Sequence, residues 1–128
     1  LAWSEGEDLV SGAPLNSVDP AEFVLGARWL APSGRWTTEL IGTAVDGKDE
    51  LEDPPAITLF RTAGYGVLDL FVNLMPNERV TVTLGLQNLT DKTYWRWSSV
   101  QGFAANDPTV ALLSAPGRSV TVSLRFPF

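Results

Sequence analysis

The sequence contains no cysteine and no histidine among its 128 residues. Without cysteine, disulfides, zinc–thiolate sites and cysteine nucleophiles are excluded within this segment. Without histidine, the most frequent general base and the commonest metal ligand are also missing. The formal net charge of −6 argues against nucleic-acid binding, which requires a basic face. No apolar run reaches the about 20 residues that a transmembrane helix needs.

What the sequence does contain is typical of one folded domain. Hydrophobic residues make up 45% of the chain, which is a globular and not a disordered composition. The first residue is Leu1 and not Met. We therefore expect residues 1–128 to be one segment of a longer chain, so that the lack of a signal peptide carries no information.

Hydrophobic residues alternate with polar ones at a period of two, which is typical of strands and not of helices. This alternation predicts strands at residues 22–30, 35–45, 64–74, 79–87 and 118–128. The opening residues 1–8 resemble the end of a sixth strand. The last strand has the cleanest pattern, and one of its faces carries Val120, Val122, Leu124, Phe126 and Phe128.

The connections between these strands alternate in length. The long connections are residues 9–20, 46–63 and 98–116, and the short turns are residues 31–34 and 75–78. Transmembrane β-barrels show this alternation, with strands of about 9–11 residues. Aromatic residues beside the short turns and at the carboxyl end are expected to form a girdle at the membrane boundary, namely Trp29, Trp36, Phe126 and Phe128.

The opposite face of the strands is polar. Its members are Arg28, Glu39, Asp69, Asn73, Gln87 and Arg125. In a soluble sandwich this face would be the outer surface, and in a membrane barrel it would line the lumen. Alternation within single strands does not separate these two folds. The loop asymmetry and the aromatic carboxyl terminus favour the membrane barrel.

Residues 64–102, GYGVLDLFVNLMPNERVTVTLGLQNLTDKTYWRWSSVQG, resemble the carboxyl-terminal signature of TonB-dependent outer-membrane receptors. The positions that match the family motif are Gly64, Tyr65, Asp69, Asn88, Leu89, Asp91, Lys92 and Tyr94. Residues 115–128, with Pro-Gly-Arg before the strand and Phe at its end, are similar to the last strand of that family. Residues 12–29 resemble its Pro-Leu-x-x-x-x-Pro segment.

The resemblance implies an all-β fold, an antiparallel up-and-down meander of about six strands. It would form the C-terminal part of a transmembrane β-barrel of about 22 strands, with the plug domain and earlier strands outside residues 1–128. The implied location is the outer membrane of a Gram-negative bacterium, with lipid around the barrel. The implied partners are the barrel-assembly machinery, which would recognise Phe126 and Phe128, and the TonB complex, which would act through the plug.

Residues 94–102, YWRWSSVQG, are similar to the family branch that binds haem, haemoglobin, transferrin and lactoferrin. This likeness implies haem or a haem protein as the transported ligand. It implies no cofactor in this segment, because the branch's haem-coordinating histidines lie upstream. The candidates for ligand contact by stacking and charge pairing are Tyr94, Trp95, Arg96 and Trp97. We favour a different interpretation of this stretch, an outer aromatic girdle with Arg96 between the rings. Tyr94 and Tyr65 are the possible iron ligands.

The sequence gives little support for a metal site, a catalytic site or a glycosylation site. The acidic residues 46–53 lack EF-hand spacing and are interpreted as a solvated loop without metal. Glu39 and Asp69 could form a carboxylate pair on neighbouring strands, but polar lumen contacts are the simpler interpretation. Residues 88–90 match a glycosylation sequon, interpreted here as a turn motif. No Gly-x-Ser-x-Gly elbow occurs, and we predict that the chain is not an enzyme.

The predicted function is therefore an outer-membrane receptor and transporter for an iron-bearing ligand, foremost haem or haemoglobin. This segment would supply barrel wall and extracellular loops. The first alternative is a receptor of the same family for a siderophore or another nutrient. A more distant alternative is a soluble ligand-binding β-barrel or sandwich.

Overall fold

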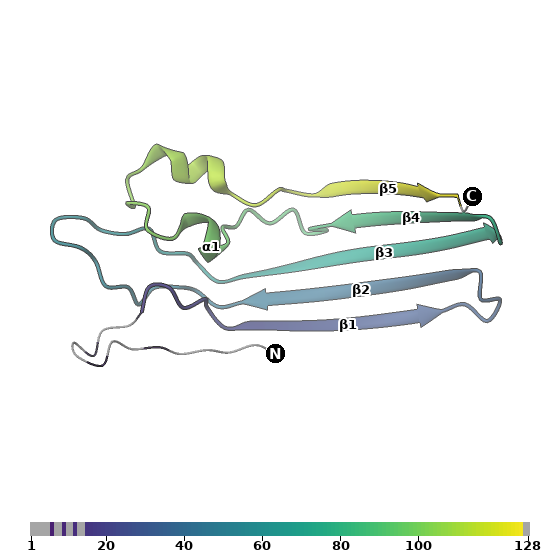
Figure 1. Ribbon diagram of the computed structural model, residues 1–128, viewed down its shortest axis with the longest axis horizontal. Helices are drawn as coiled ribbons and strands as arrows, with labels where there is room; N and C mark the ends of the chain where they lie inside the picture. The colour runs from purple at the N-terminus through teal and green to yellow at the C-terminus, as the bar shows by residue number, and fades with distance from the viewer. Residues whose placement is uncertain (1–5, 7–8, 10–11, 13–14, 127–128) are drawn as a thin grey trace. The chain divides into compact units, whose positions relative to one another are not determined.

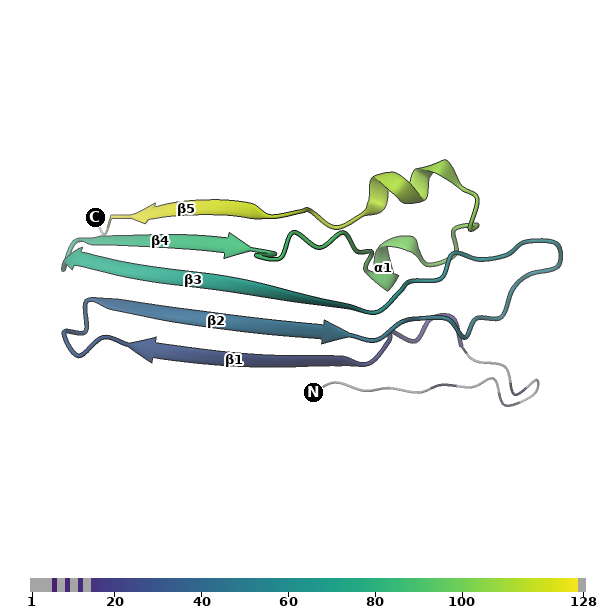
Figure 2. The same cartoon turned by 180° about the vertical axis from the view of Figure 1, so that it is seen from behind.

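The structure is a computed structural model that describes Gly6, Leu9, Gly12 and residues 15–126. Within that part of the chain, the strands form one antiparallel sheet in chain order, which confirms the predicted meander (Figure 1). The strands are β1 Glu22–Leu30, β2 Trp36–Val45, β3 Tyr65–Asn77, β4 Val80–Gln87 and β5 Ser119–Arg125. The view from behind shows the same order (Figure 2). The strand end expected in residues 1–8 lies outside the described residues, apart from Gly6.

The long connection predicted at residues 98–116 includes helical segments, and the first of them begins one residue earlier. It contains the helix α1 Trp97–Val100 and the 3-10 helix η1 Pro108–Leu113. Asp107 caps η1, because its carboxylate accepts the Thr109 backbone N–H at 2.8 Å and Pro108 needs no partner at the first position. Among the described residues, no helix has the length and apolarity to cross a membrane.

The short turn after β3 begins later than predicted. The sequence indicated a turn at residues 75–78, but β3 continues to Asn77 and the turn consists of Glu78 and Arg79. The register of β3 against β4 shifts by one residue between Leu74 and Asn77, which is a β-bulge. Pro76 lies in this bulge, where its missing N–H breaks no ladder bond.

The register of the last three strands places their apolar side chains on one face. Leu84 of β4 lies opposite Val72 of β3 and opposite Val122 of β5. The same alignment joins Leu86 to Leu70 and to Val120. Directly opposed side chains in neighbouring strands point to the same side of a sheet. The sequence-predicted apolar face is therefore continuous across β3, β4 and β5.

This apolar face has no second layer over it in the described part of the chain. Val122 is 63% exposed and Leu124 is 59% exposed, and Leu84 is only half-buried. A soluble sandwich would bury these side chains between two sheets. The described residues do not form two packed sheets, and an exposed apolar face of this kind is typical of a surface that contacts lipid or another apolar partner.

Three of the four predicted girdle residues also lie exposed. Trp29 and Trp36 flank the first short turn, with their rings in an edge-on contact at a centroid distance of 4.6 Å. Both are about half-exposed, as is Phe126 near the carboxyl end. Phe128 lies outside the described residues. The exposed rings agree with a membrane-boundary girdle.

The polar face carries its own network of hydrogen bonds. Asn73 is in its centre, since its amide donates to the Thr37 hydroxyl at 3.4 Å and accepts from the Thr83 hydroxyl at 2.7 Å. This chain of polar groups joins β2, β3 and β4. Phe71 lies on the same face, directly opposite Gly85, whose missing side chain leaves room for the ring.

The chain divides into two compact units. The sheet unit comprises residues 24–43, 66–92 and 116–128, and the loop unit comprises residues 1–23, 44–65 and 93–115. The loop unit has its own hydrophobic core around Trp97, Val100 and Val110, each at most 5% exposed. The side chains that pack against this core are Leu51, Phe60, Trp95, Phe103 and Leu113. The long connections therefore form a folded body with a core of its own.

We expect a charge on the apolar face to impair membrane assembly far more than the same charge on the polar face. Val122→Arg in the full-length protein should cost about 2–4 kcal/mol at mid-membrane depth and lower the amount of heat-modifiable barrel in membrane fractions several-fold. Ser123→Arg is the matched control, because it lies one residue away on the opposite face. Equal losses from the two substitutions would contradict the assignment of faces.

Candidate functional site

The motif residues of the sheet unit form a turn centred on Asn88. Asn88 is 4% exposed and adopts a left-handed backbone with φ of 51°, a conformation that asparagine tolerates. Its amide donates to the carbonyl oxygens of Lys92 at 2.9 Å and Pro116 at 3.2 Å, and accepts the Lys92 N–H at 2.9 Å. The backbone N–H of Asn88 donates to the Asp69 carboxylate at 2.7 Å. One side chain thus joins the end of β4 to the approach of β5.

The second half of this turn is held by Asp91. Its carboxylate accepts the Arg118 backbone N–H at 2.8 Å, just before β5. A Cβ atom on Gly117 would lie 2.9 Å from that carboxylate, so a larger residue in the Pro-Gly-Arg sequence would have to displace the Asp91 side chain. Asp91 and Asn88 therefore link the two parts of the sequence that resemble the receptor signature.

The motif residues of the loop unit form a second group. Tyr65 and Tyr94 stack with their ring centroids 4.1 Å apart. Gly64 precedes Tyr65 at a point where a Cβ atom would lie 3.1 Å from the Val45 carbonyl oxygen. The glycine thus permits two backbone segments to approach closely, and the tyrosine pair packs beside them.

The aromatic stretch at residues 94–97 is largely built into the core of the loop unit. Trp97 is 3% exposed, and its indole N–H donates to the Asn16 carbonyl oxygen at 3.0 Å. Trp95 is half-buried against Phe60, and its indole N–H donates to the Val110 carbonyl oxygen at 2.7 Å. The girdle interpretation is therefore wrong for Trp97 and for Tyr94, which is also buried. Arg96 is the exposed member of the stretch.

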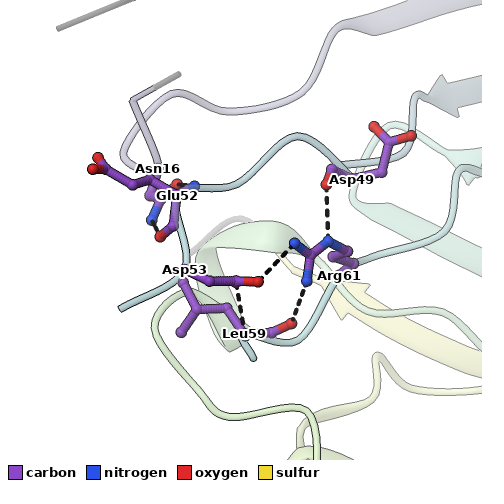
Figure 3. Close-up of polar contacts among 6 residues, drawn as sticks. All are labelled: Asn16, Asp49, Glu52, Asp53, Leu59 and Arg61. Carbon is purple, nitrogen blue, oxygen red and sulfur yellow. Dashed lines mark hydrogen bonds and ion pairs between the residues drawn. The ribbon is translucent and has the colours of Figure 1, made fainter. Parts of the chain in front are cut away.

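The loop at residues 46–63 is organised by Arg61 (Figure 3). Its guanidinium donates to the carbonyl oxygens of Asp49 at 2.9 Å and Leu59 at 3.1 Å, and it pairs with the Asp53 carboxylate at 3.0 Å. Asp53 also accepts the Leu59 backbone N–H at 3.0 Å. This N–H bond lowers the pKa of Asp53 most, and the neighbouring Arg61 lowers it further. The acidic residues Asp49, Glu50, Glu52 and Asp53 are exposed, as a solvated loop requires, and hydrogen bonds to Arg61 and Asp53 give this loop a defined backbone path.

The described residues offer no constellation for catalysis or metal binding. They contain no cluster of three or more acidic side chains arranged to hold a metal ion. Asp69 is engaged as the acceptor for Asn88 and serves the turn. An open hollow of about 490 Å³ in the loop unit is lined mainly by small residues: Ala56, Ile57, Thr58, Ala104, Ala105 and Asn106.

Comparison with known proteins decides the family. The family model described as TonB dependent receptor-like, beta-barrel matches residues 1–89. The chain belongs to the TonB-dependent receptor β-barrel family. The sequence-based resemblance is thereby confirmed. Members of this family are receptors and transporters, which also confirms the prediction that the chain is not an enzyme.

Several relatives carry names from the predicted branch. The chain is 24% identical to hemoglobin-haptoglobin-binding protein A of Haemophilus influenzae over 90% of its length, and 25% identical to lactoferrin-binding protein A of Neisseria meningitidis serogroup B over 89%. It spans only 13% and 14% of these relatives, respectively. Among solved structures, the copper transporter OprC matches 98% of the chain with a TM-score of 0.81 at 21% identity, covering 20% of OprC. That likeness shows the shared barrel fold.

Sequence reasoning missed two residues of this receptor segment. Arg61 organises the loop at residues 46–63, and Asn16 contacts both other long segments of the loop unit. The separation of Asp53 and Arg61 in the sequence matches no recognised motif. Two residues that pair across a loop can be separated by any number of positions, so the spacing alone gives no prediction. Asn16 lies within the Pro-Leu-x-x-x-x-Pro segment, and this resemblance was the one feature of the sequence that could have pointed to it.

Replacing Asn88 is expected to destabilise the assembled barrel. Asn88→Ala removes three hydrogen bonds of a buried side chain to the backbone of Lys92 and Pro116, which should cost about 1–3 kcal/mol. The full-length receptor should lose its heat-modifiable form at a lower temperature and at a lower urea concentration than the wild type. Asn106→Ala, at an exposed position, serves as control. An unchanged transition for Asn88→Ala would contradict the structural role of the turn.

The loop at residues 46–63 should keep its structure in mild acid and loosen only in strong acid. The folded pKa of Asp53 is below the ordinary value of 3.8, so its contribution is complete above that pH and is lost as the pH falls through the folded pKa. Hydrogen exchange at Leu59 should therefore be equal at pH 7 and pH 5 after correction for intrinsic rates, and faster below 3.8.

Asp53→Asn should abolish much of this acid dependence, because the amide cannot form the ion pair with Arg61. Asp49→Asn is the matched control, since Asp49 binds Arg61 through its carbonyl oxygen and not its carboxylate. If both variants changed exchange at Leu59 equally, the Asp53 carboxylate would not be the responsible group.

Proposed function

We propose that this chain supplies barrel wall and outer loops to an outer-membrane receptor that takes iron from haem or a haem protein such as haemoglobin. The observation that carries the proposal is the match to relatives named for binding haemoglobin, haemoglobin–haptoglobin and lactoferrin, over about nine-tenths of the chain. Family membership supports location in the Gram-negative outer membrane, where TonB-dependent receptors lie.

The remaining partners of the proposal follow from the same family. Lipid would cover the apolar face that carries Val120, Val122 and Leu124, all more than half exposed. The barrel-assembly machinery would recognise the carboxyl end at Phe126 and Phe128. The TonB complex would act through a plug that residues 1–128 do not include.

The share of this segment in ligand binding is contact and not iron coordination. The sequence has no histidine, and both tyrosines with a possible coordinating role, Tyr65 and Tyr94, are stacked on each other. Trp97 is buried, so its ring face is not available to a porphyrin. Arg96 is exposed and is the residue of the stretch that best suits charge pairing with a propionate or an acidic protein group.

Growth and binding assays on the full-length receptor test this function. A strain that depends on the receptor should grow with haemoglobin or haem as its sole iron source, and the purified receptor should bind haemoglobin. Arg96→Gln should weaken binding a few-fold, whereas Trp95→Ala and Trp97→Ala should weaken it by loosening the loop core.

Uptake of a ferric siderophore with no response to haem or haemoglobin would refute the proposed substrate. The substrate would then be a siderophore, and the assignment of the chain to its family would be unaffected. Arg79→Gln is a suitable control for Arg96→Gln, because Arg79 is an exposed arginine in the turn between β3 and β4.

A further inference from the structure

Asn16 makes hydrogen bonds to both of the other long segments in the loop unit. Its side-chain amide donates to the Glu52 carbonyl oxygen and accepts the Glu52 backbone N–H, each at 2.9 Å (Figure 3). Its backbone carbonyl oxygen accepts the Trp97 indole N–H and the Gln101 side-chain amide, each at 3.0 Å. One half-buried residue thus joins segments that are 36, 81 and 85 positions away in sequence.

The pair with Glu52 depends on the chemistry of asparagine. An amide carries a donor and an acceptor in the same plane, so it can pair with a peptide unit in both directions. Aspartate can only accept, and leucine, which has a similar size, can do neither. The carboxylate of Glu52 takes no part in this pair, because both bonds go to its backbone.

The other two segments of the loop unit are also joined to each other. Residues 59 and 104 form an isolated antiparallel bridge, and the Phe60 backbone N–H donates to the Phe103 carbonyl oxygen at 2.9 Å. Asn16 adds the first segment to this pair of loops. A receptor that presents ordered loops loses less conformational freedom when it binds a partner.

We propose that Asn16 is a positioning residue that holds the three segments of the loop unit as one preformed surface for capture of the ligand protein. This inference rests on the proposed function for its ligand. When only a fraction of receptors have the competent loop arrangement, the apparent association rate is reduced to that fraction of its full value. Dissociation from the formed complex is affected much less. Residues that contact the ligand directly change mainly the dissociation rate.

The test uses the full-length receptor in detergent, with haemoglobin as the probe, at a salt concentration that screens exposed charges. Asn16→Leu should lower the association rate about three- to tenfold and leave the dissociation rate within about twofold. Limited proteolysis at residues 46–63 should become several-fold faster. Glu52→Gln, which keeps the backbone pair, should match the wild type in both measurements.

Gln101→Met gives a second, milder probe, because it removes one exposed hydrogen bond to Asn16 and keeps the size of the side chain. It should lower the association rate less than Asn16→Leu, and the two substitutions together should have a less than additive effect. If Asn16→Leu assembles poorly, Gln101→Met alone tests the same hydrogen-bonded link.

Three outcomes would count against the inference or its basis. Unchanged rates of proteolysis and association in both Asn16→Leu and Gln101→Met would overturn the role of Asn16. Faster proteolysis with an unchanged association rate would show that Asn16 holds the loops but does not position them for capture, which also overturns it. If the wild type bound no haemoglobin, the proposed function would fail instead, and unchanged proteolysis in both variants would then separately reject Asn16 as the link.

Discussion

The pairing register of β3, β4 and β5 is the constraint on which the rest of the sheet unit depends. Leu84 is aligned with Val72 on one side and Val122 on the other, and a slip by one residue would turn each of these side chains to the polar face. The described chain places no second layer over the resulting apolar face. The stability of this sheet therefore depends on what covers that face, and the chain belongs to a family whose barrels sit in the Gram-negative outer membrane.

A sheet without a core beneath it must be held by its cross-strand contacts and its turns. The polar network through Asn73 joins three strands on the face opposite the apolar one. The Asn88 turn fixes the path from β4 to β5, with every polar atom of the Asn88 amide engaged in a hydrogen bond. In a low-dielectric setting such satisfied networks are strong, and a half-satisfied one would be costly. The family motif therefore has a physical basis in strand connection.

The burial of hydrophobic side chains is concentrated in the loop unit. Trp97, Val100 and Val110 form a small core there, and Arg61 and Asn16 tie the surrounding backbone together. Outer loops of a receptor are useful when they present a defined surface, because ordering them during binding would consume binding free energy. This core explains why the aromatic stretch at residues 94–97 belongs to the loops and not to a girdle.

The sequence by itself determined the strands, their faces and the family. Period-two alternation is a local property, so each strand was located to within a few residues, and the Asn-Leu-Thr-Asp-Lys stretch carried the family signature. The end of β3 was misplaced because Pro76 is accommodated by a bulge, which depends on the partner strand. The tertiary structure alone decided that Trp97 is buried and that Asn16 and Arg61 organise the loops. Those roles depend on contacts across many positions of sequence, and no local pattern records which distant segment a loop will meet.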